Sequence, residues 1–310
     1  MTELNTEDRA DSAGHCDGDL DLGRLHRELA HWNRQRLAPC QPHDQWEGEV
    51  QQDARMRLRE GAWIEWLRAD VAAQAAAAPS DVPGFVSWFE DLQTTGPGQN
   101  DPLFGWLARD AVLEDMRWFL TQEAAGEAGF DDLVALSQLK MPVTAKLELA
   151  RNYWDEMGRG NEGGMHGPML ERATQALALT PTIDQTVWPS LALANTLTAF
   201  ATTRRYAWHS IGALGIVELT APGRVACVGQ GLKRLQQPPA ARKYFDLHAM
   251  LDIKHAEDWI ANVLRPLVAE DPGRARYIAE GALMRLTCGA RCFEAYRAHL
   301  WSPARQMAAQ

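Results

Sequence analysis

Between Lys243 and His255 the chain runs Lys-Tyr-Phe-Asp-Leu-His-Ala-Met-Leu-Asp-Ile-Lys-His, with His248, Asp252 and His255 at positions i, i+4 and i+7. At about 100° per residue, these three side chains lie within roughly 60° of one another on one helix face. Imidazole and carboxylate donors without thiolate suit iron, manganese or zinc, and favour redox iron or manganese. The segment predicts a helix that presents three metal ligands. The alternative is a packed helix whose polar side chains satisfy one another.

The rest of the chain continues this helical pattern. Apolar residues recur at intervals of three and four from Asp21 onward, and long alternating runs typical of strands are absent. We therefore expect an all-α protein, with Pro142, Pro189 and Pro222 in first helical turns. The expected helices cover about 21–37, 44–78, 84–93, 103–125, 130–139, 143–157, 165–179, 188–201, 204–221, 223–235, 239–269 and 272–300.

Three regions differ in composition. Residues 1–20 are acidic and polar, which predicts a disordered tail. Residues 21–95 are predicted to form accessory helices, which could supply a homodimer surface or a lid. Residues 96–310 are predicted to form the main helical bundle.

Overall composition limits the possible partners and location. The 310 residues are 46% hydrophobic and 23% charged, with 31 Lys and Arg against 41 Asp and Glu, for a net charge of −10. Such an acidic chain is not expected to bind nucleic acid. The uncharged stretch 186–203 is interrupted by Pro189 and Asn195, so no membrane span is predicted. With no signal peptide recognisable at the N-terminus, we expect a cytoplasmic protein.

The five cysteines do not suggest a disulfide framework, because they are few and odd in number. Cys288 and Cys292 stand at i and i+4 on a predicted helix. No further cysteine pair is close in sequence to complete an iron–sulfur or zinc site, so we expect buried apolar thiols.

A second pair of candidate ligands is Glu156 and His166. On an unbroken helix they would lie about 15 Å apart, too far to share a metal. Four glycines between them, at 158, 160, 163 and 164, predict a break that lets the chain fold back. The alternative is an ordinary helix–loop–helix turn.

Glu218 is a third candidate, because it lies among small and apolar residues. A carboxylate in such surroundings is costly unless it is paired, protonated or bound to metal. Gly212 and Gly215 would allow another helix to approach closely. The alternative is a salt bridge, for instance with Arg224.

Taken in order, these residues resemble the haem-oxygenase-like di-iron oxidases and oxygenases, the iron-containing redox enzyme family, over about residues 100–300. The resemblance implies a haem-oxygenase-like helical bundle with additional N-terminal helices, whose core holds two irons rather than haem. It implies six ligands, with Glu218 as the bridging carboxylate: Glu156, His166, Glu218, His248, Asp252 and His255. Some relatives recruit another carboxylate from an earlier helix. Here Glu123 is the preferred candidate, more as a support for a ligand than as a ligand itself, whereas Glu127, Asp131 and Asp132 are expected to cap the next helix.

The resemblance also implies a reaction class. Relatives use two ferrous ions, O2 as co-substrate and an external electron donor for N-oxygenation, desaturation or oxidative C–C cleavage of small molecules; manganese could replace iron. Arg204, Arg205 and Arg224 point to a carboxylate-bearing substrate, because a guanidinium suits a carboxylate, although surface ion pairs explain each arginine better when it is taken separately. One alternative is a helical protein that holds metal or ligand without turnover. Haem binding and a cysteine-dependent hydrolase are alternatives within the same fold.

Overall fold

The computed structural model describes residues 18–42 and 44–302, and within these ranges the chain is helical with no strand. The predicted all-α fold is confirmed. The N-terminal half contains α1 (Gly18–Leu37), α2 (Trp46–Ala76), α3 (Val82–Thr95), α4 (Pro102–Arg109), α5 (Leu113–Ala125), α6 (Phe130–Ser137) and α7 (Val143–Glu156). The C-terminal half contains α8 (His166–Ala176), α9 (Trp188–Thr202), α10 (Ala207–Arg234), α11 (Pro239–Trp259), α12 (Arg265–Glu270) and α13 (Arg274–Leu300). Of the predicted tail, residues 1–17 lie outside the described residues, and α1 already includes residues 18–20.

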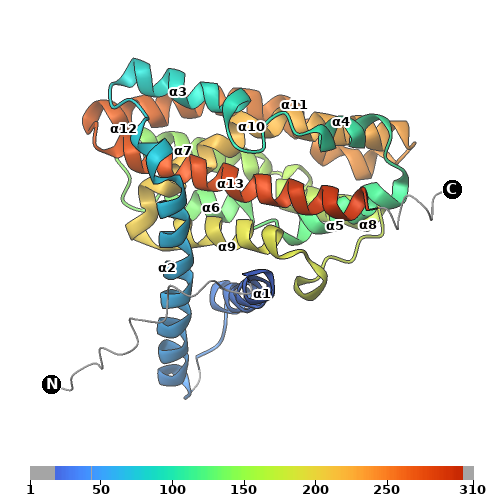
Figure 1. Cartoon of the computed structure of the whole chain (residues 1–310), viewed down its shortest axis with the longest axis horizontal. Helices are drawn as coiled ribbons and strands as arrows, with labels where there is room; N and C mark the ends of the chain where they lie inside the picture. The colour runs from blue at the N-terminus through green and yellow to red at the C-terminus, as the bar shows by residue number, and fades with distance from the viewer. Residues whose placement is uncertain (1–17, 43, 303–310) are drawn as a thin grey trace.

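Helix α10 is the central element of the bundle, with α11 and α13 packed along it (Figure 1). The close approach of α13 depends on glycine: a Cβ on Gly212 would lie 1.9 Å from the carbonyl oxygen of Ile278, and one on Gly281 would lie 2.0 Å from that of His209. Gly215 similarly makes room for the Trp259 ring, whose Nε1 would lie 2.5 Å from an added Cβ. The predicted function of Gly212 and Gly215 in close helix packing is therefore confirmed.

Pro222 departs from the prediction. It was expected to begin a helix, but it lies inside α10, which is one continuous helix rather than two. Proline cannot donate to the carbonyl four residues earlier, which belongs to Glu218. At the next residue, Gln93 Nε2 donates a 3.0 Å hydrogen bond to the Leu219 carbonyl. Packing on both sides of α10 therefore overrides the local helix-breaking tendency of proline.

Two helices predicted as continuous are divided. The segment 103–125 breaks at residues 110–112, where Asp115 accepts a 3.2 Å hydrogen bond from the Val112 amide and α5 begins anew. The segment 239–269 contains a π-helical turn, Ile260–Leu264, between α11 and α12. Pro266 explains the wider turn, because it has no amide hydrogen to offer the carbonyl of Asn262.

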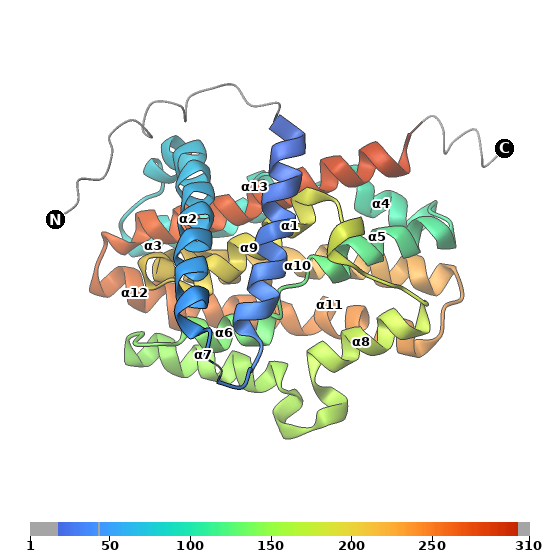
Figure 2. The same cartoon turned by 90° about the horizontal axis from the view of Figure 1, so that it is seen from below.

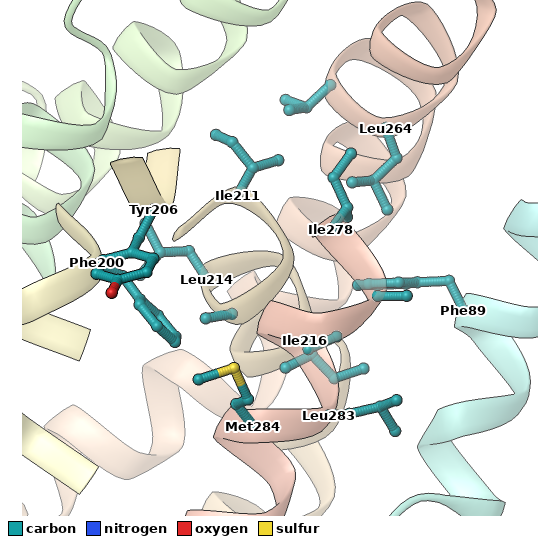
Figure 3. Packing of buried hydrophobic residues seen from close by; sticks show 14 of the residues in the cluster. Phe89, Phe200, Tyr206, Ile211, Leu214, Ile216, Leu264, Ile278, Leu283 and Met284 are labelled. Atoms are coloured by element: carbon teal, nitrogen blue, oxygen red, sulfur yellow. The ribbon is translucent and has the colours of Figure 1, made fainter. Parts of the chain in front are cut away.

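The core lies on both sides of α10 and α13. Figure 3 shows part of its larger cluster, in which Phe89, Ile216 and Leu283 come from three different helices. A fully buried aliphatic or aromatic side chain of this kind contributes roughly 1.5–3 kcal/mol. A second cluster around Phe104 and Phe293 forms the other end of the bundle. These two clusters fix α10 in place, and with it the side chains that α10 presents to α7 and α11.

The accessory helices α1 and α2 pack against α9 and α13 (Figure 2). Trp63 Nε1 of α2 donates to Thr196 Oγ1 at 2.9 Å, and Asn33 Nδ2 of α1 donates to Asn195 Oδ1 at 2.9 Å. None of the six predicted metal ligands lies on α9 or α13. The contacts of α1 and α2 therefore give no support to a lid over these ligands, and their use in a homodimer stays a prediction.

By length and composition, one helical stretch in the described residues, Arg204–Arg234, could cross a membrane. It is not the stretch 186–203 that the sequence singled out. Most of its apolar window is buried among other helices of the bundle. Apolar character of this kind is typical of the core helix of a soluble protein.

Candidate metal centre

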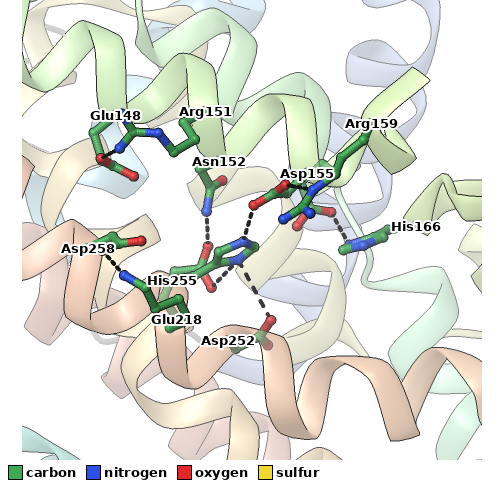
Figure 4. Close-up of polar contacts among 12 residues, drawn as sticks. Glu148, Arg151, Asn152, Asp155, Arg159, His166, Glu218, Asp252, His255 and Asp258 are labelled. Carbon is green, nitrogen blue, oxygen red and sulfur yellow. Dashed lines mark hydrogen bonds and ion pairs between the residues drawn. The ribbon is translucent and has the colours of Figure 1, made fainter. Parts of the chain in front are cut away.

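Four helices bring the six predicted ligands to one place. Glu156 ends α7, His166 begins α8, Glu218 lies in α10, and the other three lie on α11. Each of the six side chains is buried, with 2 to 8% of its surface exposed. Figure 4 shows several of them pointing toward one another between the helices. They form two groups of three, in each of which one nitrogen or oxygen atom per residue lies within 4.8 Å of the others: Glu156, His166 and His248, and Glu218, Asp252 and His255.

The first group depends on the glycine-rich break. α7 ends at Glu156, and the chain then makes two short 3-10 turns before α8 begins at His166. Gly158 has φ of 59°, and a Cβ on it would lie 2.4 Å from the carbonyl carbon of Gly164. Only glycine fits such a reversal. The predicted fold-back is confirmed, because His166 Nδ1 lies 2.6 Å from Glu156 Oε2.

His248 completes the first group from α11. Its ring centroid lies 4.5 Å from that of His166. Its Nδ1 lies 2.7 Å from the Tyr244 carbonyl oxygen, which can only accept, so Nδ1 carries the proton. The Nε2 atom is therefore the nitrogen left to bind a metal.

The second group centres on His255. Its Nδ1 lies 3.5 Å from Glu218 Oε2 and 4.0 Å from Asp252 Oδ1, while its Nε2 lies 3.2 Å from Asp155 Oδ2 (Figure 4). Asn152 Nδ2 donates a 2.7 Å hydrogen bond to Glu218 Oε1. Asp155 thus orients the imidazole from one side, and Asn152 orients the carboxylate. Neither residue was predicted from the sequence, although both share a face of α7 with Glu156 at helical spacing.

The electrostatics of both groups favour a bound cation. Burial raises the pKa of Glu156, and burial together with Glu218 raises that of Asp252. Burial and His166 lower the pKa of His248 to about 4. Burial alone would lower the pKa of His255, but the nearby Glu218 carboxylate raises it to about 9. Without a metal, burial therefore makes ionisation of Glu156 and Asp252 less favourable than in water, whereas a cation would stabilise their carboxylates.

The donor atoms also fit a metal by their geometry. Nδ1 of His166 and Nδ1 of His255 are buried, and neither has a hydrogen-bond partner despite the nearby carboxylates. Buried polar atoms without a partner require an explanation, and an ion bound between each nitrogen and its neighbouring carboxylate would provide one. Carboxylates and imidazoles without thiolate suit iron or manganese.

The loop that follows α5 contributes Glu127 to this surrounding, whereas Glu123 of α5 does not reach it. Glu127 lines the same cavity as Glu156 and His166, whereas Glu123 does not. Burial and the nearby charge of Glu156 raise the pKa of Glu127 to about 7. Its Oε1 also accepts a 3.1 Å hydrogen bond from the Gly129 amide, so its predicted capping interaction is present. Glu123 instead accepts a 2.6 Å hydrogen bond from the Tyr296 hydroxyl.

The arginines predicted to contact substrate separate in the structure. Arg204 and Arg205 lie in a 3-10 turn before α10, where Arg205 pairs with Glu65 at 3.0 Å. Neither lines the cavity beside the predicted ligands Glu156, His166 and Glu218, which we call the metal cavity. Arg224 does not pair with Glu218; its Nη2 donates to Thr220 Oγ1 at 2.9 Å. It lines a cavity next to the metal groups.

The cysteines take no part in either group. Cys288 and Cys292 are each 1% exposed on α13, as expected for buried apolar thiols. Burial raises the pKa of Cys288 to about 11, so its thiol stays protonated at neutral pH. Cys16 lies outside the described residues.

The geometry of the two ligand groups agrees with one comparison with known proteins. The family model described as "Iron-containing redox enzyme" matches residues 117–290, which include all six predicted ligands and run from α5 into α13. None of the curated proteins matches the sequence. Because the family model covers more than half of the chain, this protein belongs to the iron-containing redox enzyme family.

Proposed function

We propose that this protein is an O2-dependent non-haem di-iron oxygenase or oxidase that acts on a small substrate bearing a carboxylate or an amine. The reaction would be an N-oxygenation, a desaturation or an oxidative C–C cleavage. The observation that carries the proposal is the pair of adjacent buried ligand groups. Two ferrous ions bound there would supply the electrons for the first step of O2 reduction, and an external donor would restore them.

Two ions fit the arrangement better than one. α11 supplies His248 to the first group and both Asp252 and His255 to the second. His248 and His255 are seven residues apart and therefore about 10.5 Å apart along the helix axis, so one ion cannot bind all six ligands. Glu218 stands beside Asp252 and His255, and its carboxylate would bridge the ions. Three carboxylates would neutralise most of the charge of two divalent cations.

The chain's own residues would then hold, orient and shield the site. Asp155 fixes the His255 ring, and the Tyr244 carbonyl fixes the His248 ring. Metal-bound imidazoles are typically oriented by such partners. The cavity beside the ligands measures about 120 Å³ and is lined in part by Leu170 and Val217. Its small apolar walls would limit the access of bulk water.

Oxygen uptake tests the proposal. Anaerobically loaded ferrous protein mixed with O2 should consume it and develop a transient visible absorption, and candidate carboxylates or amines should change the rate. The control is the His248→Ala variant treated in the same way, which should do neither. Metal retention without O2 uptake, with any reductant or substrate tried, would instead support a metal-holding protein without turnover. We propose a cytoplasmic location as part of the same function.

A further inference from the structure

A second cavity adjoins the metal cavity. It measures about 180 Å³, and the two share the wall formed by Glu127, Leu170, Val217, Ala221, Val225 and Tyr244. Phenylalanine side chains, among them Phe104 and Phe293, line another part of it. A ligand in this cavity would therefore contact apolar walls and face the metal groups across Glu127 and Tyr244. Apolar cavities with a few polar groups are typical small-molecule sites.

Two arginines, the buried Arg285 and the partly buried Arg224, line this cavity with unused hydrogen-bond donors. Arg285 of α13 is only 9% exposed, and its Nε and Nη1 have no hydrogen-bond partner. Arg224 of α10 uses Nη2 to bind Thr220, while its buried Nη1 has none. Its guanidinium carbon lies 5.5 Å from the centre of the Phe293 ring. Buried donors without partners are costly, so their presence at a cavity wall indicates a ligand that accepts hydrogen bonds.

The charges around these arginines leave a positive excess. Glu123 lines the same cavity and interacts with both guanidinium groups. Glu123 is a single carboxylate whose pKa is raised by burial, so it offsets at most one of the two positive charges. Burial and the charge of Arg285 lower the pKa of Arg224 to about 9, as expected for two cations that share a buried site. Glu127 also lines this cavity and interacts with Arg285, but burial and the charges of Glu156 and Glu123 raise its pKa to about 7, so it offsets the arginines only in part.

We propose that Arg224 and Arg285 bind the carboxylate of the substrate, and that the substrate is a small carboxylic acid whose apolar or aromatic body extends toward the metal groups. This inference rests on the proposed function and specifies its substrate class. A single carboxylate can accept hydrogen bonds from both guanidinium groups and adds only one negative charge. A phosphate dianion would instead add a second negative charge beside Glu123 and Glu127. Arginine is suited to this task because it stays charged when buried and offers planar donors.

Binding of simple probes to metal-free protein tests the inference without turnover. Hexanoate and phenylacetate, compared with hexanamide and phenylacetamide, can be titrated into the full chain by calorimetry after removal of metal with chelator. We expect the acids to bind at least ~10-fold more tightly than the amides, because each charged hydrogen bond discriminates by about that factor. Arg224→Gln and Arg285→Gln should each lose this preference. The matched control is Arg205→Gln, because Arg205 is exposed and lies near another cavity. This variant should retain the preference for acids.

Several results would overturn the inference. Equal binding of acids and amides to the unmodified protein would do so, even if the glutamine variants failed to fold. Retained preference in folded Arg224→Gln and Arg285→Gln variants would do so as well. Tighter binding of hexyl phosphate than of hexanoate would contradict the carboxylate class. The metal content of the same preparations keeps the two proposals distinguishable: acid preference without iron binding contradicts only the di-iron function, and iron binding without acid preference contradicts only this inference.

Discussion

Two buried polar clusters contact α10, and they differ in how they balance charge. In the Glu280 cluster, one carboxylate on α13 accepts hydrogen bonds from Arg68 Nε at 2.9 Å, His209 Nε2 at 2.9 Å and Arg276 Nε at 3.2 Å. Burial would raise the pKa of Glu280, but these donors lower it to about 2. The cluster therefore has its own cations and needs no ligand.

The metal cluster, formed by the six predicted ligands, lacks such cations. Among the described residues, the ion pairs of its carboxylates Glu156, Glu218 and Asp252 are with histidines only. The nearest arginine pair belongs to Asp155, whose Oδ1 lies 2.6 Å from Arg159 Nε. Buried carboxylates without arginine or lysine are costly unless a proton or metal compensates them. The comparison teaches that burial of acids alone does not indicate a functional site, whereas burial of acids without cations does.

The largest expected difference between the clusters is in bound iron. Protein expressed with iron should approach two irons per chain by elemental analysis, and Asp252→Ala should lose most of this metal because it removes a ligand from α11. Glu280→Gln changes an equally buried acid and should keep the full iron content. Full occupancy in all three of the His248→Ala, Asp252→Ala and His255→Ala variants would contradict the assignment.

The stability of the metal-free protein should respond in the opposite sense to its iron content, because it should depend on Glu280 and not on Asp252. In metal-free protein, Glu280→Ala leaves Arg68 and His209 without their shared acceptor, so the free energy of unfolding should fall by about 3–5 kcal/mol. Asp252→Asn removes an acid that burial and Glu218 make costly to ionise. This substitution should therefore leave the metal-free protein as stable as before, or more stable.

Urea unfolding of both variants after chelation measures this difference. The proposed difference between the two clusters is wrong if Asp252→Asn destabilises the metal-free protein as strongly as Glu280→Ala does. Adding Mn²⁺ provides an internal control, because bound metal should stabilise Glu280→Ala and leave Asp252→Asn less affected.

The convergence of the six predicted ligands was largely predictable from sequence because its signals are local. Three ligands share one helix face at i, i+4 and i+7, and the glycines around Gly158 mark the reversal that joins Glu156 to His166. Helical periodicity likewise gave the all-α fold. The prediction for Pro222 was wrong, because this residue lies inside α10 and not at the start of a helix.

Residues that act through distant contacts could not be predicted in the same way. Arg285 lies in the sequence among apolar neighbours of a long helix, and only the fold places it opposite Arg224 on another helix. Arg204 and Arg205 were attractive because they precede Glu218, but a short turn directs Arg205 to Glu65. Proximity in sequence to a ligand therefore did not predict proximity to the cavity.

A smaller effect is expected from the residue that orients His255. Asp155→Asn keeps a hydrogen-bonding side chain beside His255 Nε2 but removes its charge. Loss of such a carboxylate partner typically lowers metal affinity by about 10- to 100-fold. Competition with a fluorescent chelator measures this affinity. Glu148→Gln is the matched control, because Glu148 is also a buried acid of α7 but binds Asn262 and Arg151 rather than a histidine.

The smallest and most gradual difference between the two clusters is in how their contributions to stability depend on pH. Glu280 has a lowered pKa in the folded protein, so its contribution to stability is complete above the unfolded value of 4.5 and is lost as the pH falls toward about 2. His255 has a raised pKa, so its contribution is complete below 6.5 and is lost as the pH rises through about 9. Asp252 acts in the same direction, because its ionisation is costly in the fold.

Metal-free protein should therefore lose stability between pH 6.5 and 9, and Asp252→Asn should reduce that loss. With Mn²⁺ present the trend should reverse, because the metal displaces the protons of Asp252 and His255 more easily as the pH rises. Thermal unfolding across this range, with and without metal, measures both trends. The Glu280 cluster contributes a constant amount in this window, so a metal-free stability that stays flat from pH 6.5 to 9 would show that the metal cluster is balanced without a cation.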